Sequence, residues 1–381
     1  MNLILRWPHW SQKGFVIAFA LLYVLTGCSG GSMAGSGQTA STLWTVADAQ
    51  SEFHDFNDAF YYNITGSEYG YRVDEGSANA ASFWISANEI ATAVDAYQNL
   101  GGSTYQQVVS QLVNGFNEAH PAWWNGSDEY DDDMMWATLA FISAYQAVGT
   151  SAWLSDAEDA YQTVYSRGLA TGGGIYWDAE GCPSNCSNSY ENSAANWTFV
   201  IAGIMLYKQT GNTTYLKEAN AVYSWAYSNL YDSSTGEVYD ASTSKNQYSY
   251  NYGVAIGAYS LRGDPSDATL AAKYMMSDLP NYAGTYNGYF ILPEYDNSED
   301  GSDGGGFNGI ALRWTAYAYR NGAISDKSVL SWMQVNVEQG WLENNSAGLS
   351  WNNWESPTPG SGLYSWDCTD TVVGMLDVPL Q

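Results

Sequence analysis

The chain has 381 residues, with 12 Lys and Arg against 40 Asp and Glu, which gives a formal net charge of −28. Phosphate binding needs a basic surface, so this charge argues against nucleic acid as a partner and also disfavours anionic polysaccharides. Seventeen Trp and thirty-one Tyr supply flat rings that suit the apolar faces of sugars, although many must simply fill the core.

Residues 1–27 have the pattern of a bacterial lipoprotein signal peptide. Arg6 and Lys13 provide the positive start, and the apolar segment that follows is too short to span a bilayer comfortably. This segment ends in Leu25-Thr26-Gly27-Cys28, which resembles the lipoprotein cleavage box. The resemblance implies cleavage before Cys28, lipidation of its thiol, and anchoring of the exported protein to the bacterial cell envelope, at the outer membrane or cell surface.

A linker and one domain follow the signal peptide. Residues 28–44 begin with the lipidated Cys28 and are rich in Gly and Ser, so we expect a flexible linker. Residues 45–381 contain no comparable linker. They are long for one domain, but toroids and barrels reach this size. We expect this domain to be a monomer.

A helix-turn-helix pattern recurs along the domain. An aromatic residue, a Gly four positions later and another aromatic after four more occur at 97–105, 145–153 and 207–215. The Gly is expected to take the left-handed conformation that ends one helix, and the next helix begins within a few residues. The copies stand roughly 50–60 residues apart, the length of one helical hairpin with a loop.

Apolar periodicity predicts about twelve helices in all. Their approximate cores are 46–64, 79–99, 104–118, 133–148, 152–168, 191–209, 213–230, 248–261, 266–279, 306–320, 327–340 and 366–378. Six hairpins that close on themselves would form an all-α toroid, and an open helical solenoid is the alternative. Long loops follow alternate helices, at 119–132, 169–190, 231–247, 280–305 and 344–365, and would line a cleft at one rim. Their clusters of Trp, Gly and acid favour the closed ring.

Three consecutive acids, Asp131, Asp132 and Asp133, stand where one of these helices begins. They repel one another, and Asp is unfavourable inside a helix, so we expect them in the first turn, where the helix dipole favours anions. Trp136 and other tryptophans nearby can raise the pKa of a carboxyl cut off from water. Two carboxyls in unequal environments are what a glycosidase needs, although an acidic N-cap of an ordinary helix is the alternative.

The cysteines and the acidic loops indicate no metal site. Cys182 and Cys186 can close a small disulfide loop in an oxidising compartment, which leaves Cys368 unpaired unless it takes one of them. A Gly-rich acidic loop from Asp296 to Asp303 has ligands for calcium, but the EF-hand spacing fails and a solvated loop is the preferred interpretation. We therefore predict no metal and no cofactor.

Five stretches, in this order and spacing, resemble glycoside hydrolase family 76, the endo-α-1,6-mannanases. They are Asp132-Asp133-Met134-Met135-Trp136, residues 172–177, Asn192 to Trp197 with Leu206-Tyr207 and Thr210-Gly211, Tyr250-Asn251-Tyr252-Gly253, and Phe307-Asn308-Gly309-Ile310 with Arg313. Over about residues 45–380 the resemblance implies an (α/α)6 barrel. It also implies retaining, endo-acting hydrolysis of α-1,6 linkages in mannan, a neutral polysaccharide. Some relatives act instead as cell-wall transglycosylases.

The resemblance assigns Asp132 as nucleophile and Asp133 as acid/base, because the family's adjacent pair stands three residues before the Trp. Neighbouring Cα atoms are about 3.8 Å apart, so the two carboxyls can approach the roughly 5–5.5 Å separation of a retaining pair. Asp131 is expected to cap the helix or to support the pair. The residues expected to bind or surround the substrate are Asp131, Trp136, Trp177, Asn192, Asn196, Tyr250, Asn251, Tyr252, Phe307, Asn308 and Arg313.

Three positions depart from the family pattern. Glu191 and Asn308 each replace a Lys, and Tyr252 replaces a Gln. The catalytic pair is untouched, so we expect hydrolysis with altered sugar contacts. A cell-surface transglycosylase on the same scaffold and a non-catalytic glycan-binding lipoprotein are the alternatives, and the intact pair argues against the second.

Overall fold

The structure, a computed structural model, describes residues 43–66, 68–128, 130–179, 189–295 and 303–381. The predicted lipidation site Cys28 and the predicted disulfide between Cys182 and Cys186 lie outside these residues. Most of the acidic loop considered for calcium also lies outside them. Residues 43–381 form one unit, and the following account concerns that unit.

All twelve predicted helices occur in the described part of the chain. They are α1 (Val46–Phe60), α2 (Phe83–Leu100), α3 (Ser103–Ala119), α4 (Asp131–Val148), α5 (Ser151–Gly168), α6 (Ser193–Thr210), α7 (Thr213–Asn229), α8 (Ser249–Arg262), α9 (Pro265–Ser277), α10 (Phe307–Arg320), α11 (Lys327–Leu342) and α12 (Thr369–Asp377). The first helix is shorter than predicted. It ends at Phe60 because the β-prone run that follows pairs as a strand.

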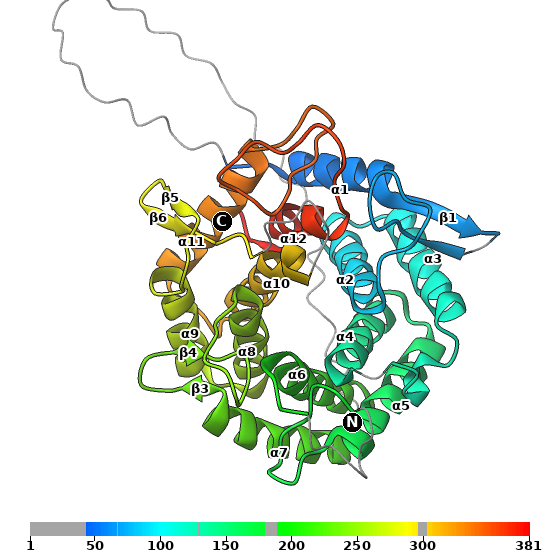
Figure 1. Cartoon of the computed structure of the whole chain (residues 1–381), viewed down its shortest axis with the longest axis vertical. Coiled ribbons are helices and arrows are strands. Elements are labelled where there is room, and N and C mark those ends of the chain that lie inside the picture. The colour runs from blue at the N-terminus through cyan, green and yellow to red at the C-terminus, as the bar shows by residue number, and fades with distance from the viewer. Residues whose placement is uncertain (1–42, 67, 129, 180–188, 296–302) are drawn as a thin grey trace, which may run out of the picture. The chain divides into compact units, whose positions relative to one another are not determined.

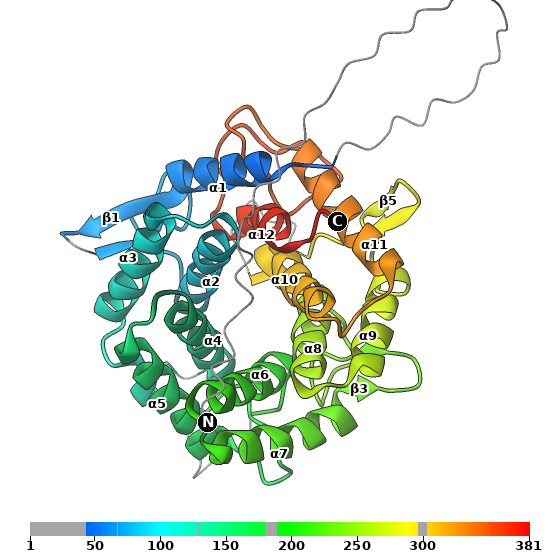
Figure 2. The ribbon, with the colours of Figure 1, turned by 180° about the vertical axis from the view of Figure 1, so that it is seen from behind.

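The helices form a closed double ring (Figures 1 and 2). The even-numbered helices α2 to α12 stand inside, and the odd-numbered helices α1 to α11 pack around them. Each inner helix contacts the next one, and α12 contacts α2, which closes the inner ring. The predicted (α/α)6 barrel is therefore confirmed, and the open solenoid is wrong.

Short turns lead from inner to outer helices at one rim, which we call the short-turn rim. Gly101, Gly149, Gly211 and Gly263 end α2, α4, α6 and α8 with φ of 72°, 91°, 74° and 86°. Only Gly takes this left-handed conformation freely, and each Gly N–H donates to a carbonyl in the last turn of its helix. The predicted glycine signal for the helix ends is confirmed.

The longer connections lead back from outer to inner helices at the opposite rim, which we call the long-loop rim. Three of them carry small antiparallel hairpins. These are β1 (Tyr61–Thr65) with β2 (Glu68–Tyr71), β3 (Tyr231–Asp232) with β4 (Glu237–Val238), and β5 (Gly284–Tyr286) with β6 (Tyr289–Ile291). Because every inner helix follows such a connection, all six inner helices start at this rim.

Aromatic side chains fill much of the space between the helices. Trp44, Trp123, Trp197, Trp332 and Trp354 are almost fully buried, as expected for most of the many tryptophans. Among the described residues, no helix is both long and apolar enough to cross a membrane.

Candidate active site

The three consecutive acids occupy the first turn of α4, at the long-loop rim, as predicted. Successive helical residues are rotated by about 100°, so adjacent side chains leave the helix in different directions. Asp131 contacts Arg167 of α5, and Asp132 contacts Asn192 at the start of α6. Asp133 is less buried than its two neighbours. The run thus divides into three carboxyls with three separate environments.

Asp132 is held by two hydrogen bonds. Its side chain is 8% exposed, and Oδ2 accepts from Asn192 Nδ2 at 3.1 Å while Oδ1 accepts from the Asp133 backbone N–H at 3.1 Å. Asn192 is also the N-cap of α6, and its Oδ1 accepts from the Ala195 N–H at 2.9 Å. Capping uses the amide oxygen, so the amide NH₂ group is left to face Asp132.

The electrostatics separate the two catalytic candidates. Burial raises the pKa of Asp132, and the hydrogen bonds from Asn192 and from the backbone oppose that rise. Burial also raises the pKa of Asp133, and the charges of Asp132, Asp128 and Asp303 raise it further. Two coupled carboxyls lose their protons one after the other, and the carboxyl that accepts hydrogen bonds from nearby donors loses its proton first. Asp132 is therefore the member of the pair that ionises first, and Asp133 keeps its proton to higher pH.

The side chain of Asp131 has partners of its own, separate from those of the pair. It is fully buried, and its Oδ1 accepts from Arg167 Nε at 2.8 Å in a buried ion pair. Burial raises the pKa of Asp131 to about 7, which the Arg167 charge partly opposes. Its backbone N–H donates to the Trp177 carbonyl at 2.8 Å. Asp131 therefore has contacts inside the protein, and we do not retain it as a direct contact for substrate.

Aromatic residues lie on one side of the pair, where the loops before α4 and α6 meet. The Tyr130 and Trp177 rings have centroids 4.9 Å apart, and Trp177 and Tyr190 have centroids 5.4 Å apart. The pKa of Tyr190 is raised by burial and by the charges of Asp240 and Asp132, which places Tyr190 near the nucleophile candidate. Trp177 is partly exposed, so it offers a ring to a ligand.

A second aromatic group lies at the starts of α8 and α10. The Tyr250 and Phe307 ring centroids are 4.3 Å apart, with Tyr248 and Tyr295 also against Phe307. Tyr250 donates its hydroxyl proton to Asp240 Oδ1 at 3.0 Å. Asn251 Nδ2 donates to the same oxygen at 3.2 Å. Burial raises the pKa of Tyr250, and the charge of Asp132 contributes to this rise, as it does for Tyr190, so both aromatic groups lie near the nucleophile candidate.

Trp84 and Trp366 form a third aromatic element, at the starts of α2 and α12. Their rings meet edge to face with centroids 5.0 Å apart. Trp366 Nε1 donates to the Asp303 carbonyl at 2.9 Å, and a Cβ added at Gly306 would lie 2.4 Å from the Trp366 ring. Only a Gly-rich turn can pack so closely on this ring. The turn brings Asp303 near Asp133, where its charge acts on the acid/base candidate.

Four other predicted residues are fully or almost fully buried, three with hydrogen bonds to protein atoms and one in the hydrophobic core. Asn196 exchanges hydrogen bonds with the Ile175 backbone, at 2.8 Å in both directions, so it holds the Gly-rich loop to α6. Asn308 accepts from Ser249 Oγ at 2.7 Å and donates to the Pro293 carbonyl at 3.0 Å. Trp136 belongs to the hydrophobic core. Asn251, the fourth of these residues, donates a hydrogen bond to Asp240.

Two predicted residues lie outside the site altogether. Tyr252 is fully buried, stacks on Tyr274 of the outer helix α9 and donates to Gln247 Oε1 at 2.6 Å. Arg313 forms an ion pair with Asp95 of α2, with Nε and Oδ2 2.7 Å apart. Of the two interpretations open for Arg313, the structural ion pair is therefore correct. As direct substrate contacts, both assignments are contradicted by these positions.

Several residues of the site had no sequence signal that singled them out. Asp240 follows the β3–β4 hairpin, and Arg167 stands in the last turn of an outer helix. The sequence places Asp303 only in a loop with possible calcium ligands. No set of His, Cys, Asp or Glu in the described ranges has the arrangement of a metal site. The absence of a metal and a cofactor stays a prediction.

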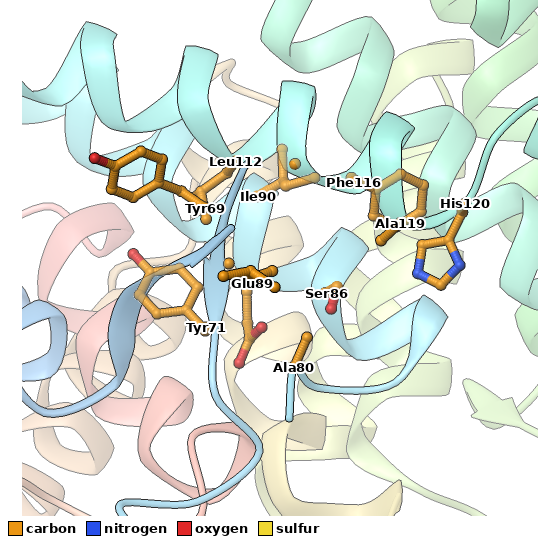
Figure 3. A pocket seen from close by; sticks show the side chains of 13 residues that line it. Tyr69, Tyr71, Ala80, Ser86, Glu89, Ile90, Leu112, Phe116, Ala119 and His120 are labelled. Atoms are coloured by element: carbon orange, nitrogen blue, oxygen red, sulfur yellow. The ribbon is translucent and has the colours of Figure 1, made fainter. Parts of the chain in front are cut away.

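A separate cavity of about 30 Å³ lies between β2, α2 and α3 (Figure 3). Its lining is largely apolar, with Ile90, Leu112 and Phe116 on one side and Glu89 among the few polar groups. Burial raises the pKa of Glu89 to about 8, so this carboxyl is protonated at neutral pH. The volume suits about one water molecule and no sugar ring. This cavity is therefore not a substrate site.

Comparisons with known proteins identify the family of the chain. The model of the family described as glycosyl hydrolase family 76 matches residues 45–367. A mannan endo-1,6-alpha-mannosidase of Saccharomyces cerevisiae is 23% identical over 252 residues, which are 59% of this chain and 53% of that protein. The match thus spans about half the length of that relative. A putative mannan endo-1,6-alpha-mannosidase of Schizosaccharomyces pombe is 22% identical over 327 residues, 76% of this chain and 72% of that protein.

Solved structures share the fold. The alpha-1,6-mannanase of a Salegentibacter species superposes with a TM-score of 0.75 at 21% identity, over 87% of this chain and 98% of that one. An inactive variant of that enzyme, with two consecutive aspartates replaced by alanine, is in complex with alpha-1,6-mannotetrose. The match of the family model over most of the domain, together with this ring of helices, shows that the chain belongs to glycosyl hydrolase family 76.

Proposed function

We propose that the protein is a retaining, endo-acting glycoside hydrolase that cleaves α-1,6-mannosidic linkages in mannan. The observation that carries the proposal is the unequal environment of two adjacent carboxyls. Asp132 accepts hydrogen bonds from two donors, whereas the pKa of Asp133 is raised by the charges around it. A retaining glycosidase needs this combination of an ionised nucleophile and a protonated acid.

In the first step, a carboxylate oxygen of Asp132 attacks C1 of a mannose residue. The bond from C1 to the O6 of the next mannose breaks, and Asp133 gives its proton to that oxygen as it leaves. The product is a covalent glycosyl-enzyme, and the released chain ends in a free 6-hydroxyl. Asp132 has lost its negative charge at this point, so the pKa of Asp133 falls and its carboxylate can accept a proton.

In the second step, Asp133 removes a proton from a water molecule that attacks the same C1. The bond between C1 and Asp132 breaks, which restores the ionised nucleophile and the protonated acid. Because C1 is attacked twice from opposite faces, the released mannose keeps the α configuration. Adjacent residues on one helical turn support this pathway, since an inverting pair needs carboxyls far enough apart to hold a water molecule between them.

The substrate class follows from the surroundings and from the relatives. Aromatic rings beside the pair suit sugar faces, and the acidic chain disfavours a charged polymer. Both fungal relatives are named mannan endo-1,6-alpha-mannosidases, and the Salegentibacter enzyme binds an α-1,6-linked tetrasaccharide. We infer that the same linkage is the substrate of this chain.

The decisive experiment is incubation of the purified protein with linear α-1,6-mannan. We expect internal cleavage into a ladder of oligosaccharides, separated by chromatography, and initial products in the α configuration by NMR. Release of mannose alone, or of β-configured products, would contradict the proposal. A transglycosylase uses the same first step but transfers the glycosyl group to a sugar hydroxyl. Products longer than an added α-1,6-mannotetraose would favour that alternative.

We also propose that the enzyme is lipid-anchored at the bacterial cell envelope, because Leu25-Thr26-Gly27-Cys28 resembles the lipoprotein box. Cys28→Ser should release the protein from membranes or block its processing. Growth with labelled palmitate measures lipidation directly. Equal membrane retention of the Cys28→Ser protein after a salt wash would count against the anchor.

A further inference from the structure

We propose that Arg167 is a positioning residue of the catalytic site, which acts through Asp131 to set the directions in which Asp132 and Asp133 leave the first turn of α4. The inference rests on the proposed function, since it concerns how the catalytic pair is held. Neither the family resemblance nor the predicted motifs assigned a role to Arg167. Its position at the end of the outer helix α5 brings it against the start of α4.

Arg167 joins three segments that are separate in the sequence. Its Nε donates to Asp131 Oδ1 at 2.8 Å, and its Nη1 donates to the Gly126 carbonyl at 3.2 Å. One turn earlier on α5, Thr163 Oγ1 donates to the Trp124 carbonyl at 2.8 Å. The end of α5 therefore holds both the loop that leads into α4 and the first residue of that helix.

The space around the ion pair leaves little freedom. A Cβ at position 168 would lie 2.0 Å from Asp131 Oδ2, and a Cβ at position 126 would lie 2.6 Å from Arg167 Nη1. Both positions are Gly, so the guanidinium and the carboxylate lie directly against backbone. Because Asp131 is fully buried, its side chain has no room to turn without moving the helix start.

Stability alone does not account for this arrangement. Asp131 Oδ2 and Arg167 Nη2 are buried and have no hydrogen-bond partner within the described part of the chain. A buried ion pair with unsatisfied atoms recovers little of its desolvation cost, and apolar residues of similar size would often be as stable. The ion pair between Arg167 and Asp131 instead sets the orientation of the first turn of α4, because Asp131 immediately precedes the nucleophile on the same helical turn.

The first test separates position from charge. Gly168→Ala changes no charge but pushes a methyl group against Asp131 Oδ2, whereas Arg167→Met removes the cation. Both should lower kcat on α-1,6-mannan, on the order of 10²-fold, as expected when reacting groups are misplaced by about 1 Å. KM should change little, because the aromatic rings that bind sugar remain. Arg167→Lys, which keeps the charge, should lose less than Arg167→Met.

Arg320→Met is the matched control. Arg320 pairs with Asp377, and Nη2 and Oδ1 are 3.1 Å apart. Asp377 is 2% exposed. The pair lies at the short-turn rim, at the opposite end of the helices from the site. The Arg320→Met variant should have a lower melting temperature than the wild type, as Arg167→Met should, but an unchanged kcat. Activity is measured well below each melting temperature, and Arg167→Lys replaces Arg167→Met if the latter does not fold.

Three results would overturn the inference. One is an unchanged kcat in folded Arg167→Met and Gly168→Ala proteins, and another is an equal loss of kcat in the Arg320→Met control. The third is a loss in Arg167→Met but none in Gly168→Ala, which would show that charge and not position matters. An inactive wild-type protein would instead contradict the proposed function, and this inference with it.

Discussion

The two rims of the barrel use opposite ends of the same inner helices. At the long-loop rim, α4 begins with Asp131, Asp132 and Asp133, and α12 has Asp370 in its first turn. At the short-turn rim, α6, α8 and α10 carry Lys208, Arg262 and Arg320 in their last turns. Acids at helix N-termini and bases at C-termini both complement the helix dipole.

Buried carboxyls pair with a base at both rims, as Asp131 does with Arg167, but Asp132 and Asp133 do not. At the short-turn rim, Asp377 pairs with Arg320, and Asp95 of α2 pairs with Arg313 of α10. At the long-loop rim, the only charged partner of Asp132 in the described structure is another acid. Asp132 accepts its hydrogen bonds from an amide group and from a backbone N–H. Burial raises the pKa of Asp95 as well, to about 7, although its Arg313 partner opposes the rise, whereas the charges that act on Asp133 are all acids and raise its pKa further. The difference therefore lies in the partners: bases hold the carboxyls of Asp377 and Asp95, and only acids act on the carboxyl of Asp133.

The largest expected effect tests the nucleophile. Asp132→Asn should abolish mannan cleavage, because an amide cannot form the glycosyl-enzyme, while the near-identical shape preserves the contact with Asn192. Activity is measured by reducing-end release, with circular dichroism melting as the check on folding. Substantial residual activity with retained configuration would show that another carboxyl is the nucleophile.

Asp133→Asn should reduce kcat on mannan by about 10²–10⁴-fold, because general acid assistance is lost. The deficit should shrink on aryl mannosides with good leaving groups, which depart without protonation. The wild-type enzyme should lose activity as pH rises through the raised pKa of Asp133, since the acid must be protonated. This alkaline decline should vanish in the variant, and its persistence would point to a different acid.

Asn192→Ser and Asn212→Ser compare equivalent caps at the two rims. Both Asn side chains cap a helix, α6 and α7 respectively, and Ser can cap in their place. Asn192→Ser also removes the donor to Asp132, so the pKa of Asp132 rises and the acidic limb of the pH profile moves upward. We expect kcat to fall about 10- to 100-fold for Asn192→Ser, from the loss of a hydrogen bond to a charged group.

Asn212→Ser is the control for that comparison and should leave the pH profile unchanged. Its hydrogen bond to the Thr214 N–H is local, at 3.0 Å, and lies at the short-turn rim. Equal activity losses in the two variants would mean that Asn192 acts by capping α6 and not through Asp132.

The smallest effect concerns the short-turn rim itself. Gly149→Ala forces an Ala into φ of 91°, although no atom lies within 4 Å of the added Cβ. The cost is therefore conformational, about 1–2 kcal/mol in the free energy of unfolding, which urea titration measures. kcat should be unaffected, and a change in kcat would show that the two rims are not independent.

The number and order of the helices followed from the sequence because their signals are local. Gly149 and Gly211 end helices through their own backbone freedom, and three acids cannot stand comfortably except at a helix start. The sequence predicts the catalytic pair on the same local ground, with the family resemblance to assign the roles, and these roles stay predictions. Disulfide pairing between Cys182 and Cys186 and lipidation of Cys28 remain predictions.

The neighbours of the pair were decided by the tertiary structure. Tyr250 and Tyr252 stand two residues apart on α8, yet one lies beside Asp240 and the other packs on the outer helix α9. Inner helices are buried on nearly every side, as α6 is from residue 193 to 206, so apolar periodicity cannot tell which face looks toward the site. Asp303 precedes α10, and closure of the ring brings it near Asp133, whereas Arg167 reaches Asp131 through the packing of the outer helix α5 on α4.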